Sequence, residues 1–288
     1  MVVHPLYALA EQMQVLRLHC TLQIQQDGEL PVFKGSALHG WLGQQLLKQD
    51  AELYHVLYAE HESQQPKPYA LACHDFRTCY TKNSLLSFQL TLFGSATALA
   101  ERLVQALCQQ TLGLGSARLA VKVHTVASKT PSGLRLGIHP LPLLAWLTVE
   151  SEQVWQTFCV QLLSPLRLKQ CGAILKQEAP SLVLMVNQVQ RRLAGLVKFW
   201  MDDSQAWQQL LKEHIQLGEY QMLSPSFYFE DWQRYSVARQ QYLPFGGLLG
   251  EISYQGDIYH ALVWLQIGEI LQIGGKTSFG LGCYQLIY

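Results

Sequence analysis

The stretch VLRLHCTLQIQQDGELPVFKGSALHGWLGQQLLK, residues 15–48, changes its hydrophobic period partway along. Apolar and polar side chains alternate from Val15 to Ile24, which is typical of a strand with one buried face and one polar face. From Gly35 to Lys48 the apolar residues recur at helical spacing instead, and Ser36 is a suitable N-cap for that helix. The stretch therefore predicts a strand followed by a helix that begins near Ser36.

The same order of elements continues along the chain and then recurs. In the first half, the patterns predict strands at 69–73, 85–92 and 118–126 and a helix at 97–110. In the second half, they predict strands at 155–163, 233–239, 248–254 and 283–288 and helices at 180–200 and 258–270. Each half then has the βαββαβ order of a ferredoxin-like fold. We predict an α+β protein of two tandem ferredoxin-like (RRM-like) units, at residues 1–130 and 145–288, with the Pro- and Gly-rich segment 131–142 as a linker.

Composition indicates a globular protein with balanced charge. The chain has 288 residues, of which 49% are hydrophobic and 15% charged, enough for one large or two moderate domains. Its 21 Lys and Arg residues match 21 Asp and Glu residues, which excludes a general polyanion binder but leaves room for a local basic surface.

The seven cysteines form no CxxC pair, which favours reduced structural thiols. The beginning of the chain lacks the pattern of a secretory signal, and no apolar stretch is long enough to span a bilayer. We therefore expect a soluble, cytoplasmic protein with no membrane partner.

Glycines are concentrated near the end of the chain, where residues 246–282 contain nine of the 21. In the segment IGGKTSFGLGCYQLIY (273–288), Gly274 and Gly275 allow backbone amides to approach a phosphate closely, while Lys276 and Thr277 add a charge and a hydroxyl. The expected order of helix, loop and strand excludes a P-loop, which precedes a helix. By composition alone, a tight turn without any ligand is an equally good interpretation.

Five segments together resemble one known family. They are FKGSALHGWLG (33–43), LSPLRLK (163–169), RYSVARQQ (234–241), FGGLLGEISYQGD (245–257) and GGKTSFGLGCYQL (274–286). With the tandem ferredoxin-like units, they resemble the CRISPR-associated endoribonucleases that process precursor CRISPR RNA, the sixth Cas family within the RAMP superfamily. The likeness extends over nearly the whole chain.

This resemblance implies a nuclease that needs neither a metal ion nor another cofactor. In the family's chemistry, the 2′-hydroxyl upstream of the scissile phosphate attacks it, which leaves a 2′,3′-cyclic phosphate and a 5′-hydroxyl. The partner implied is CRISPR repeat RNA within precursor crRNA. Further implied partners are other Cas proteins of an effector complex, or a reverse transcriptase and an integrase if the chain is part of a fusion.

His39 occupies the place where members of this family commonly carry a catalytic histidine, on the first helix. Its helical neighbours Gly35, Ser36 and Gly43 are small, so a bulky substrate has room to reach the imidazole. An imidazole of ordinary pKa, about 6.5, serves as general base for the 2′-hydroxyl or as general acid for the leaving oxygen, and the sequence does not choose between these roles.

Some relatives complete a triad with a Tyr before the helix and a Lys after the His, but here those places hold Ile24 and Gln45. The cation that neutralises the phosphate must then come from elsewhere. Lys34 at the helix entrance is our candidate, supported by the positive N-terminus of the helix.

The candidate RNA contacts are charged or small polar residues near the expected site and along the long helix, although each charge alone is also typical of a solvated surface. They are Arg17, His19, Ser36, Arg191, Arg192, Arg234, Arg239, Gly274, Gly275, Lys276 and Thr277. A metal site is not expected, because His74 and its neighbours Cys73 and Cys79 lack a second ligand pair with zinc spacing.

Two other functions remain open at this stage. The missing Tyr and Lys are compatible with a non-catalytic RAMP protein, either an RNA binder or a structural subunit of a CRISPR ribonucleoprotein. A ligand sensor whose Gly-rich loop binds a nucleotide phosphate is a weaker third alternative, since only the loop supports it.

Overall fold

The computed structural model describes residues 5–58, 65–109, 112–148, 157–236 and 241–288. The chain forms two compact units, one of residues 1–145 with 195–207 and one of residues 146–194 with 208–288. This division differs from the expected boundaries at 130 and 145, because the first unit is longer and also contains the short segment 195–207.

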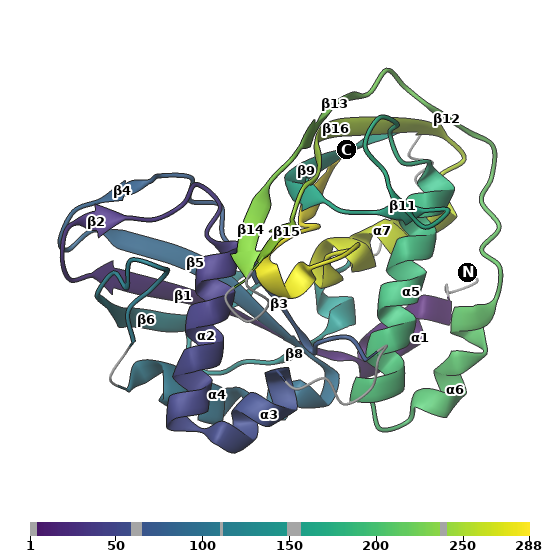
Figure 1. Cartoon of the computed structure of the whole chain (residues 1–288). Coiled ribbons are helices and arrows are strands. Elements are labelled where there is room, and N and C mark those ends of the chain that lie inside the picture. The colour runs from purple at the N-terminus through teal and green to yellow at the C-terminus, as the bar shows by residue number, and fades with distance from the viewer. Residues whose placement is uncertain (1–4, 59–64, 110–111, 149–156, 237–240) are drawn as a thin grey trace. The chain divides into compact units, whose positions relative to one another are not determined.

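The first unit is built on an antiparallel sheet with strand order β3-β5-β1-β6-β7 (Figure 1). The strands are β1 (Gln14–Ile24), β3 (Tyr69–Ala72), β5 (Leu85–Phe93), β6 (Val121–Thr130) and β7 (Gly133–Leu136). Central strand β1 pairs with β5 on one side and β6 on the other. Leu16, Leu18 and Leu22 on one face of β1 are fully buried, as the alternation predicts.

Four helices and a short ribbon complete the first unit. The helices are α1 (Pro5–Gln12), α2 (Gly35–Gln49), α3 (Ala51–Tyr58) and α4 (Ala100–Cys108), and the ribbon pairs β2 (Gly28–Glu29) with β4 (Cys79–Tyr80). Helix α2 buries Leu38, Trp41, Leu42 and Leu46 at the helical spacing seen in the sequence. The indole of Trp41 donates a hydrogen bond of 3.0 Å to the Leu112 carbonyl, which ties α2 to the chain beyond α4.

The segment 131–142 is not a linker, contrary to our expectation. After a turn at Gly133, whose φ is +119°, strand β7 returns alongside β6. Strand β8 (Leu141–Pro142) then pairs with the beginning of β1. The prolines and glycines of the segment 131–142 form a tight turn and the end of an edge strand. Composition alone does not distinguish such a segment from a linker.

The second unit has a sheet of strand order β12-β16-β9-β17, with β13 also paired to β16. The strands are β9 (Thr157–Leu166), β12 (Tyr220–Met222), β13 (Ser226–Glu230), β16 (Gly247–Gly256) and β17 (Tyr284–Ile287). Its helices are α5 (Leu182–Trp200) and α7 (Tyr259–Leu271), and ten of the 13 residues of α7 are buried. Its smaller elements are β10 (Lys169–Gln170) and β11 (Ala173–Ile174). Helix α6 (Ser204–Gln208) falls in the first unit, except for its last residue.

Both units have the ferredoxin-like strand order, in which the first and third strands of the βαββαβ series lie in the middle of the sheet. One strand prediction was wrong, because residues 233–236 do not join the second sheet. They form β14 (Gln233–Ser236), which pairs with β15 (Gln241–Pro244). On the side of β16 away from β9, the neighbours are instead β12 and β13. Two short strands therefore replace the single strand that we expected.

The last turns of α5 belong to the first unit. There the indole of Trp200 donates a hydrogen bond of 3.0 Å to the carbonyl of Pro66. Within the described part of the chain, no helix combines the length and the apolar character that crossing a membrane requires.

Candidate active site around His39

His39 lies in the second turn of α2 and is partly exposed. Its ring nitrogen Nδ1 lies 3.2 Å from the hydroxyl of Tyr69, which comes from β3. Its backbone carbonyl accepts a hydrogen bond of 2.9 Å from the hydroxyl of Tyr58, at the end of α3. Two phenols from two other elements thus hold His39, one through the imidazole and one through the backbone.

These two phenols belong to an aromatic group that we call the tyrosine cluster, defined as Tyr54, Tyr58 and Tyr69. The imidazole of His39 lies 5.0 Å from the ring of Tyr58 and 6.3 Å from that of Tyr69, centroid to centroid. Tyr54 stacks on Tyr58 at 5.2 Å with an angle of 14° between the rings. The cluster forms a wall of rings beside His39, and such contacts restrict how the imidazole can turn.

The phenols stay neutral at ordinary pH. Burial raises the pKa of Tyr69 above its usual value, and burial together with interaction with Tyr69 raises the pKa of Tyr58. A neutral phenol donates and accepts hydrogen bonds, so Tyr69 is able to pair with the imidazole in either of its protonation states.

Gly43, one turn after His39, creates the space for this cluster. A Cβ at Gly43 would lie 2.7 Å from the Cε1 of Tyr58, so only glycine lets the ring pack here. The space that we had expected a substrate to use at this position is therefore filled by Tyr58. At Gly40, in contrast, a Cβ would meet nothing within 4 Å.

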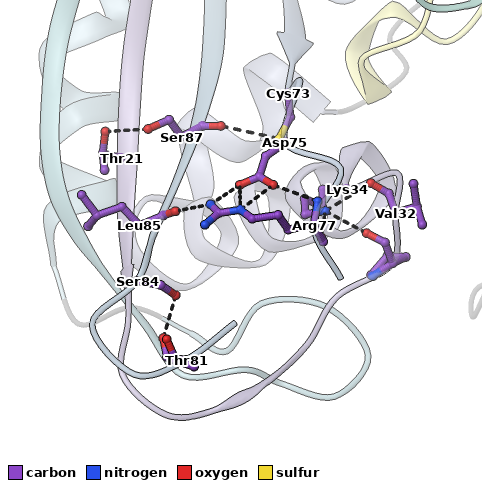
Figure 2. Close-up of polar contacts among 11 residues, drawn as sticks. Thr21, Val32, Lys34, Cys73, Asp75, Arg77, Thr81, Ser84, Leu85 and Ser87 are labelled. Carbon is purple, nitrogen blue, oxygen red and sulfur yellow. Dashed lines mark hydrogen bonds and ion pairs between the residues drawn. The ribbon is translucent and has the colours of Figure 1, made fainter. Parts of the chain in front are cut away.

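Lys34 is not a surface cation, which corrects our sequence-based expectation. Its side chain is 1% exposed, and its ammonium donates hydrogen bonds to the carbonyls of Pro31 at 3.1 Å, Val32 at 3.2 Å and Arg77 at 2.5 Å (Figure 2). An ammonium has three donors, and here all three bond to backbone oxygens. Lys34 therefore fastens the chain before α2 to the segment before β4 and cannot also contact a phosphate.

Charge around Lys34 supports this structural role. Burial lowers the pKa of Lys34, while the nearby carboxylate of Asp75 acts against that shift. Burial would by itself raise the pKa of Asp75, but hydrogen bonds from Arg77 outweigh it and hold that pKa below its usual value. Arg77 forms an ion pair of 2.5 Å with Asp75 and donates a bond of 2.7 Å to the carbonyl of Leu85 (Figure 2).

Ser36 and Gln45 also differ from expectation in their surroundings. Lys34 occupies the N-cap position of α2 and makes no side-chain cap, so Ser36 lies inside the first turn. Gln45, at the place where some relatives have a Lys, is fully buried. Its amide donates to the Ala106 carbonyl and accepts from the Leu112 amide, both at 3.0 Å. Gln45 thus links α2 to α4 and the segment after it.

The polar face of β1 carries the candidates Arg17 and His19. The Arg17 guanidinium donates to the side-chain oxygen of Gln89 at 3.2 Å, and Arg17 lies opposite Lys129 in the register of β1 and β6. Burial, and next the charge of Lys129, lower the pKa of His19, so this histidine is neutral at pH 7. The face is therefore positive through Arg17 and Lys129 rather than through His19.

The Gly-rich loop after α7 is tightly constrained. The amide of Gly275 donates to the Arg167 carbonyl at 2.9 Å, and the amide of Gly282 donates to the Pro165 carbonyl at 3.0 Å. Gly274 has a φ of +81°, and a Cβ there would lie 2.5 Å from the Arg167 carbonyl oxygen. These glycines allow the loop to lie directly against the backbone that follows β9.

Lys276 and Thr277 follow at the tip of this loop. Lys276 has a φ of +71°, and its ammonium lies 5.5 Å from the Phe245 ring and 5.6 Å from the Phe279 ring. Thr277 is buried, whereas Gly275 is exposed. Gly275 is thus exposed, and Lys276 beside it is partly exposed. Cation–π contacts with the two phenylalanine rings restrict the ammonium of Lys276.

The remaining candidates differ in accessibility. Arg191 on α5 is exposed, but Nε and one terminal nitrogen of Arg192 are buried, and burial lowers the pKa of Arg192 to about 10. The backbone of Arg234 pairs with Leu243 in the ribbon of β14 and β15. Arg239 lies outside the described residues. In the described ranges, no three His, Cys, Asp or Glu side chains come together as a metal site would need.

Sequence reasoning missed Tyr69 and Tyr58 as parts of the site. We had searched for a tyrosine just before the helix, whereas Tyr69 lies 30 residues after His39 and on a different strand. The only available signal was that Tyr69 begins a predicted strand of the same sheet. Which strand end lies beside α2 depends on the tertiary fold, which local spacing does not reveal.

Comparison with known proteins finds one family model for each half of the chain. A family model described as the CRISPR-associated endoribonuclease Cas6 matches residues 160–284, and a model described as an N-terminal domain matches residues 13–141. A search of curated proteins finds no significant match.

Several solved structures share the fold over nearly the whole chain. A partial Cas6-RT-Cas1–Cas2 complex has a TM-score of 0.61 at 12% identity, over 96% of this chain and 46% of the matched one. Cas6 of Thermus thermophilus has a TM-score of 0.57 at 15% identity, over 96% and 99% of the two chains. A Cas6 product complex has a TM-score of 0.56 at 17% identity, over 96% and 100%.

This chain spans less than half of the Cas6-RT-Cas1–Cas2 chains that it matches, 46% and 29% in the two structures. It spans essentially all of the separate Cas6 proteins. The family model described as the CRISPR-associated endoribonuclease Cas6 thus covers residues 160–284, and the chain as a whole shares the fold of the solved Cas6 structures.

Proposed function

We propose that this protein cleaves precursor CRISPR RNA at its repeats without a metal ion, with His39 transferring a proton in the reaction. The observation that carries the proposal is the placement of His39, partly exposed on α2, with its Nδ1 held 3.2 Å from a buried phenol. A histidine that merely fills the surface of a helix does not need a partner that fixes its ring.

In this reaction the nucleophile belongs to the substrate. The 2′-oxygen bonds to phosphorus, the bond to the 5′-oxygen breaks, and one proton passes overall from the 2′-oxygen to the 5′-oxygen. The products are a 2′,3′-cyclic phosphate and a 5′-hydroxyl. The protein has to supply proton transfer, a suitable alignment and compensation of the growing negative charge.

The negative charge on the phosphate must be neutralised by a residue other than Lys34, because the ammonium of Lys34 bonds to three carbonyls. We propose that RNA contacts come from exposed or partly exposed cations, namely Arg17, Arg191 and Lys276, together with the exposed backbone at Gly275. The likeness to Cas6-RT-Cas1–Cas2 complexes supports the further proposal that a reverse transcriptase and Cas1 are partners.

The test is cleavage of labelled repeat RNA in EDTA by the wild type and by His39→Ala. We expect the variant to bind RNA normally but to lose roughly 10²- to 10⁴-fold in cleavage rate, the usual contribution of general acid–base catalysis. A substrate with a single 2′-deoxy linkage at the scissile position should resist the wild type. Cleavage of that substrate, or cleavage by His39→Ala at the wild-type rate, would contradict the proposal.

A second candidate function is RNA binding without cleavage. The burial of Gln45 at the position of the relatives' Lys and the burial of Lys34 favour it, because neither residue offers a cation next to His39. Tight binding of the repeat with no cleavage by the wild type would establish this alternative.

A further inference from the structure

We propose that Tyr69 is a positioning residue that holds Nδ1 of His39, so that Nε2 is the ring nitrogen that exchanges a proton with the RNA. This inference rests on the proposed function, since it assigns a role within the same site. It concerns a tyrosine on β3, whereas the resemblance led us to look for one before the first helix.

The geometry separates the roles of the two phenols near His39. The Tyr58 hydroxyl donates a hydrogen bond of 2.9 Å to the His39 carbonyl, which fixes the helix backbone, and it also hydrogen-bonds with Tyr69. Tyr69 instead reaches the imidazole itself, 3.2 Å from Nδ1. Of the two, only Tyr69 is placed to control the orientation and the tautomer of the ring.

Tyr69 is well suited to hold its partner in place. It is 1% exposed and pairs with Leu92 in the register of β3 and β5, so the sheet fixes its backbone and the core fixes its ring. A rigid partner lowers the entropy that the imidazole must lose before it reacts. The partly exposed edge of His39 is then presented to the substrate in one orientation.

The phenol supports both protonation states of the imidazole. It is neutral because burial raises its pKa, so its oxygen accepts a hydrogen bond from Nδ1–H both in the neutral ring and in the imidazolium. This contact favours the neutral tautomer whose proton is on Nδ1 and whose Nε2 carries a lone pair. When Nε2 takes a proton from the 2′-hydroxyl, the positive charge spreads over the ring and Nδ1–H still donates to the Tyr69 oxygen. When Nε2 returns the proton to the leaving 5′-oxygen, the original arrangement is restored.

Among the described residues, the phenols of Tyr69 on β3 and Tyr58 on α3 lie beside the imidazole of His39, with Tyr54 stacked behind Tyr58. Burial raises the pKa of Tyr69 and of Tyr58, so neither phenol adds a charge there at ordinary pH. Removal of the Tyr69 hydroxyl takes away both its contact with Nδ1 and its hydrogen bond with Tyr58, so the tautomer of His39 is measured as well as the pH profile of cleavage.

The experiment compares Tyr69→Phe with the wild type and with Tyr228→Phe, a control at an exposed tyrosine on β13 outside the cluster. Single-turnover cleavage is measured from pH 5 to 9, and repeat RNA affinity is measured separately. We expect Tyr69→Phe to cleave roughly five- to tenfold more slowly, as the loss of one net hydrogen bond implies, with unchanged affinity and a shifted pH profile. Tyr228→Phe should behave as the wild type.

A second measurement is independent of activity. In free protein labelled with ¹⁵N-histidine, the signals of His39 are identified by their loss in His39→Ala. We expect one dominant tautomer in the wild type and a mixture of both in Tyr69→Phe. Because this measurement also uses the wild type, it remains informative if the phenylalanine variant folds poorly.

The outcomes distinguish this inference from the proposed function. Wild-type rates and pH profile in Tyr69→Phe, or a mixed tautomer in the wild type, overturn the role of Tyr69 even if His39→Ala is inactive. Absence of cleavage by the wild type overturns the proposed function, while the ¹⁵N spectra still show whether Tyr69 holds His39.

Discussion

Lys34 shows how the environment of a residue can reverse the interpretation of its charge. In the sequence, a lysine at the entrance of the helix that carries His39 is a reasonable phosphate ligand. In the structure, the side chain turns inward and its ammonium bonds to Pro31, Val32 and Arg77. The side chain thus fixes the point where α2 begins, which in turn sets the position of His39.

The prediction at this site is that Lys34→Met destabilises the protein. The methionine keeps the apolar volume but leaves buried carbonyls without their donor, which costs roughly 1–3 kcal/mol for an unsatisfied buried group. The measurement is urea unfolding, with Lys48→Met as the control, because Lys48 is exposed on the same helix. A stable Lys34→Met variant with wild-type folding but no cleavage would instead support a direct catalytic role for Lys34.

Glycines decide where the elements can approach one another. In α2, Gly43 allows contact with Tyr58, and in the Gly-rich loop, Gly282 lies so close to the chain that a Cβ would be 1.8 Å from the Ile273 carbonyl oxygen. Gly40 and Gly275 lack such close neighbours. Each element therefore contains both a position that requires glycine and one that tolerates alanine, which provides matched pairs of variants.

For α2, we predict that Gly40→Ala stabilises the protein and Gly43→Ala does not. Alanine in a helix interior is favoured over glycine by about 1 kcal/mol. At Gly43 this gain is opposed by the contact of 2.7 Å with Tyr58, which must move away from His39. The measurements are the melting temperature and the cleavage rate, and slower cleavage is expected only for Gly43→Ala. Equal melting temperatures and equal cleavage rates of the two variants would show that the packing of Tyr58 against position 43 affects neither stability nor cleavage.

For the Gly-rich loop, we predict that Gly275→Ala folds normally and binds RNA more weakly. Apart from the two adjacent residues, the atom nearest to its new Cβ would be the Cδ of Arg167 at 3.7 Å, so any loss arises in contact with the RNA. Gly282→Ala should be strongly destabilised, since its φ is +76° and the space is occupied. The readouts are thermal melting and repeat RNA affinity. Unchanged affinity in Gly275→Ala would exclude close approach of RNA at this residue.

The elements differed in how well the sequence predicted them. The strand at 15–24 and the helix at 35–48 agree with β1 and α2 to within one residue at each end, because both have a strong hydrophobic period. The segments at 131–142 and 233–239 were misassigned, since short paired strands rich in turn residues have little periodicity. His39 was found through its resemblance to a family, but Tyr69 was not, because its contact with α2 arises only from tertiary packing.

At the scale of the whole molecule, buried phenols are found in both units. Tyr69, together with the partly exposed Tyr58, lies in the first unit, and Tyr254 and Tyr284 lie in the second. Burial raises the pKa of each of these four tyrosines. In the second unit, the hydroxyl of Tyr254 donates to the Pro180 carbonyl and that of Tyr284 donates to the Leu265 carbonyl, both at 2.6 Å.

These raised values predict that stability falls in alkaline solution. The unfolded tyrosines ionise near pH 10, whereas the folded ones hold their protons to higher pH. Above about pH 10 the folded state therefore binds more protons than the unfolded state, and the free energy of unfolding decreases as pH rises. The free energy of unfolding is measured in urea at pH 8 and at pH 10.5. Tyr284→Phe removes one of the four phenols, so its free energy of unfolding should change less between these two pH values. A wild-type stability that is constant across this range would contradict the prediction.

The contact between Gly43 and Tyr58 also has a consequence for how such a sequence can change over time. The two positions lie on different helices, yet a larger side chain at position 43 can be accommodated only if the ring at position 58 becomes smaller or moves. Either change made first disturbs the surroundings of His39. We therefore expect these positions to vary as a pair, with neither free to drift on its own.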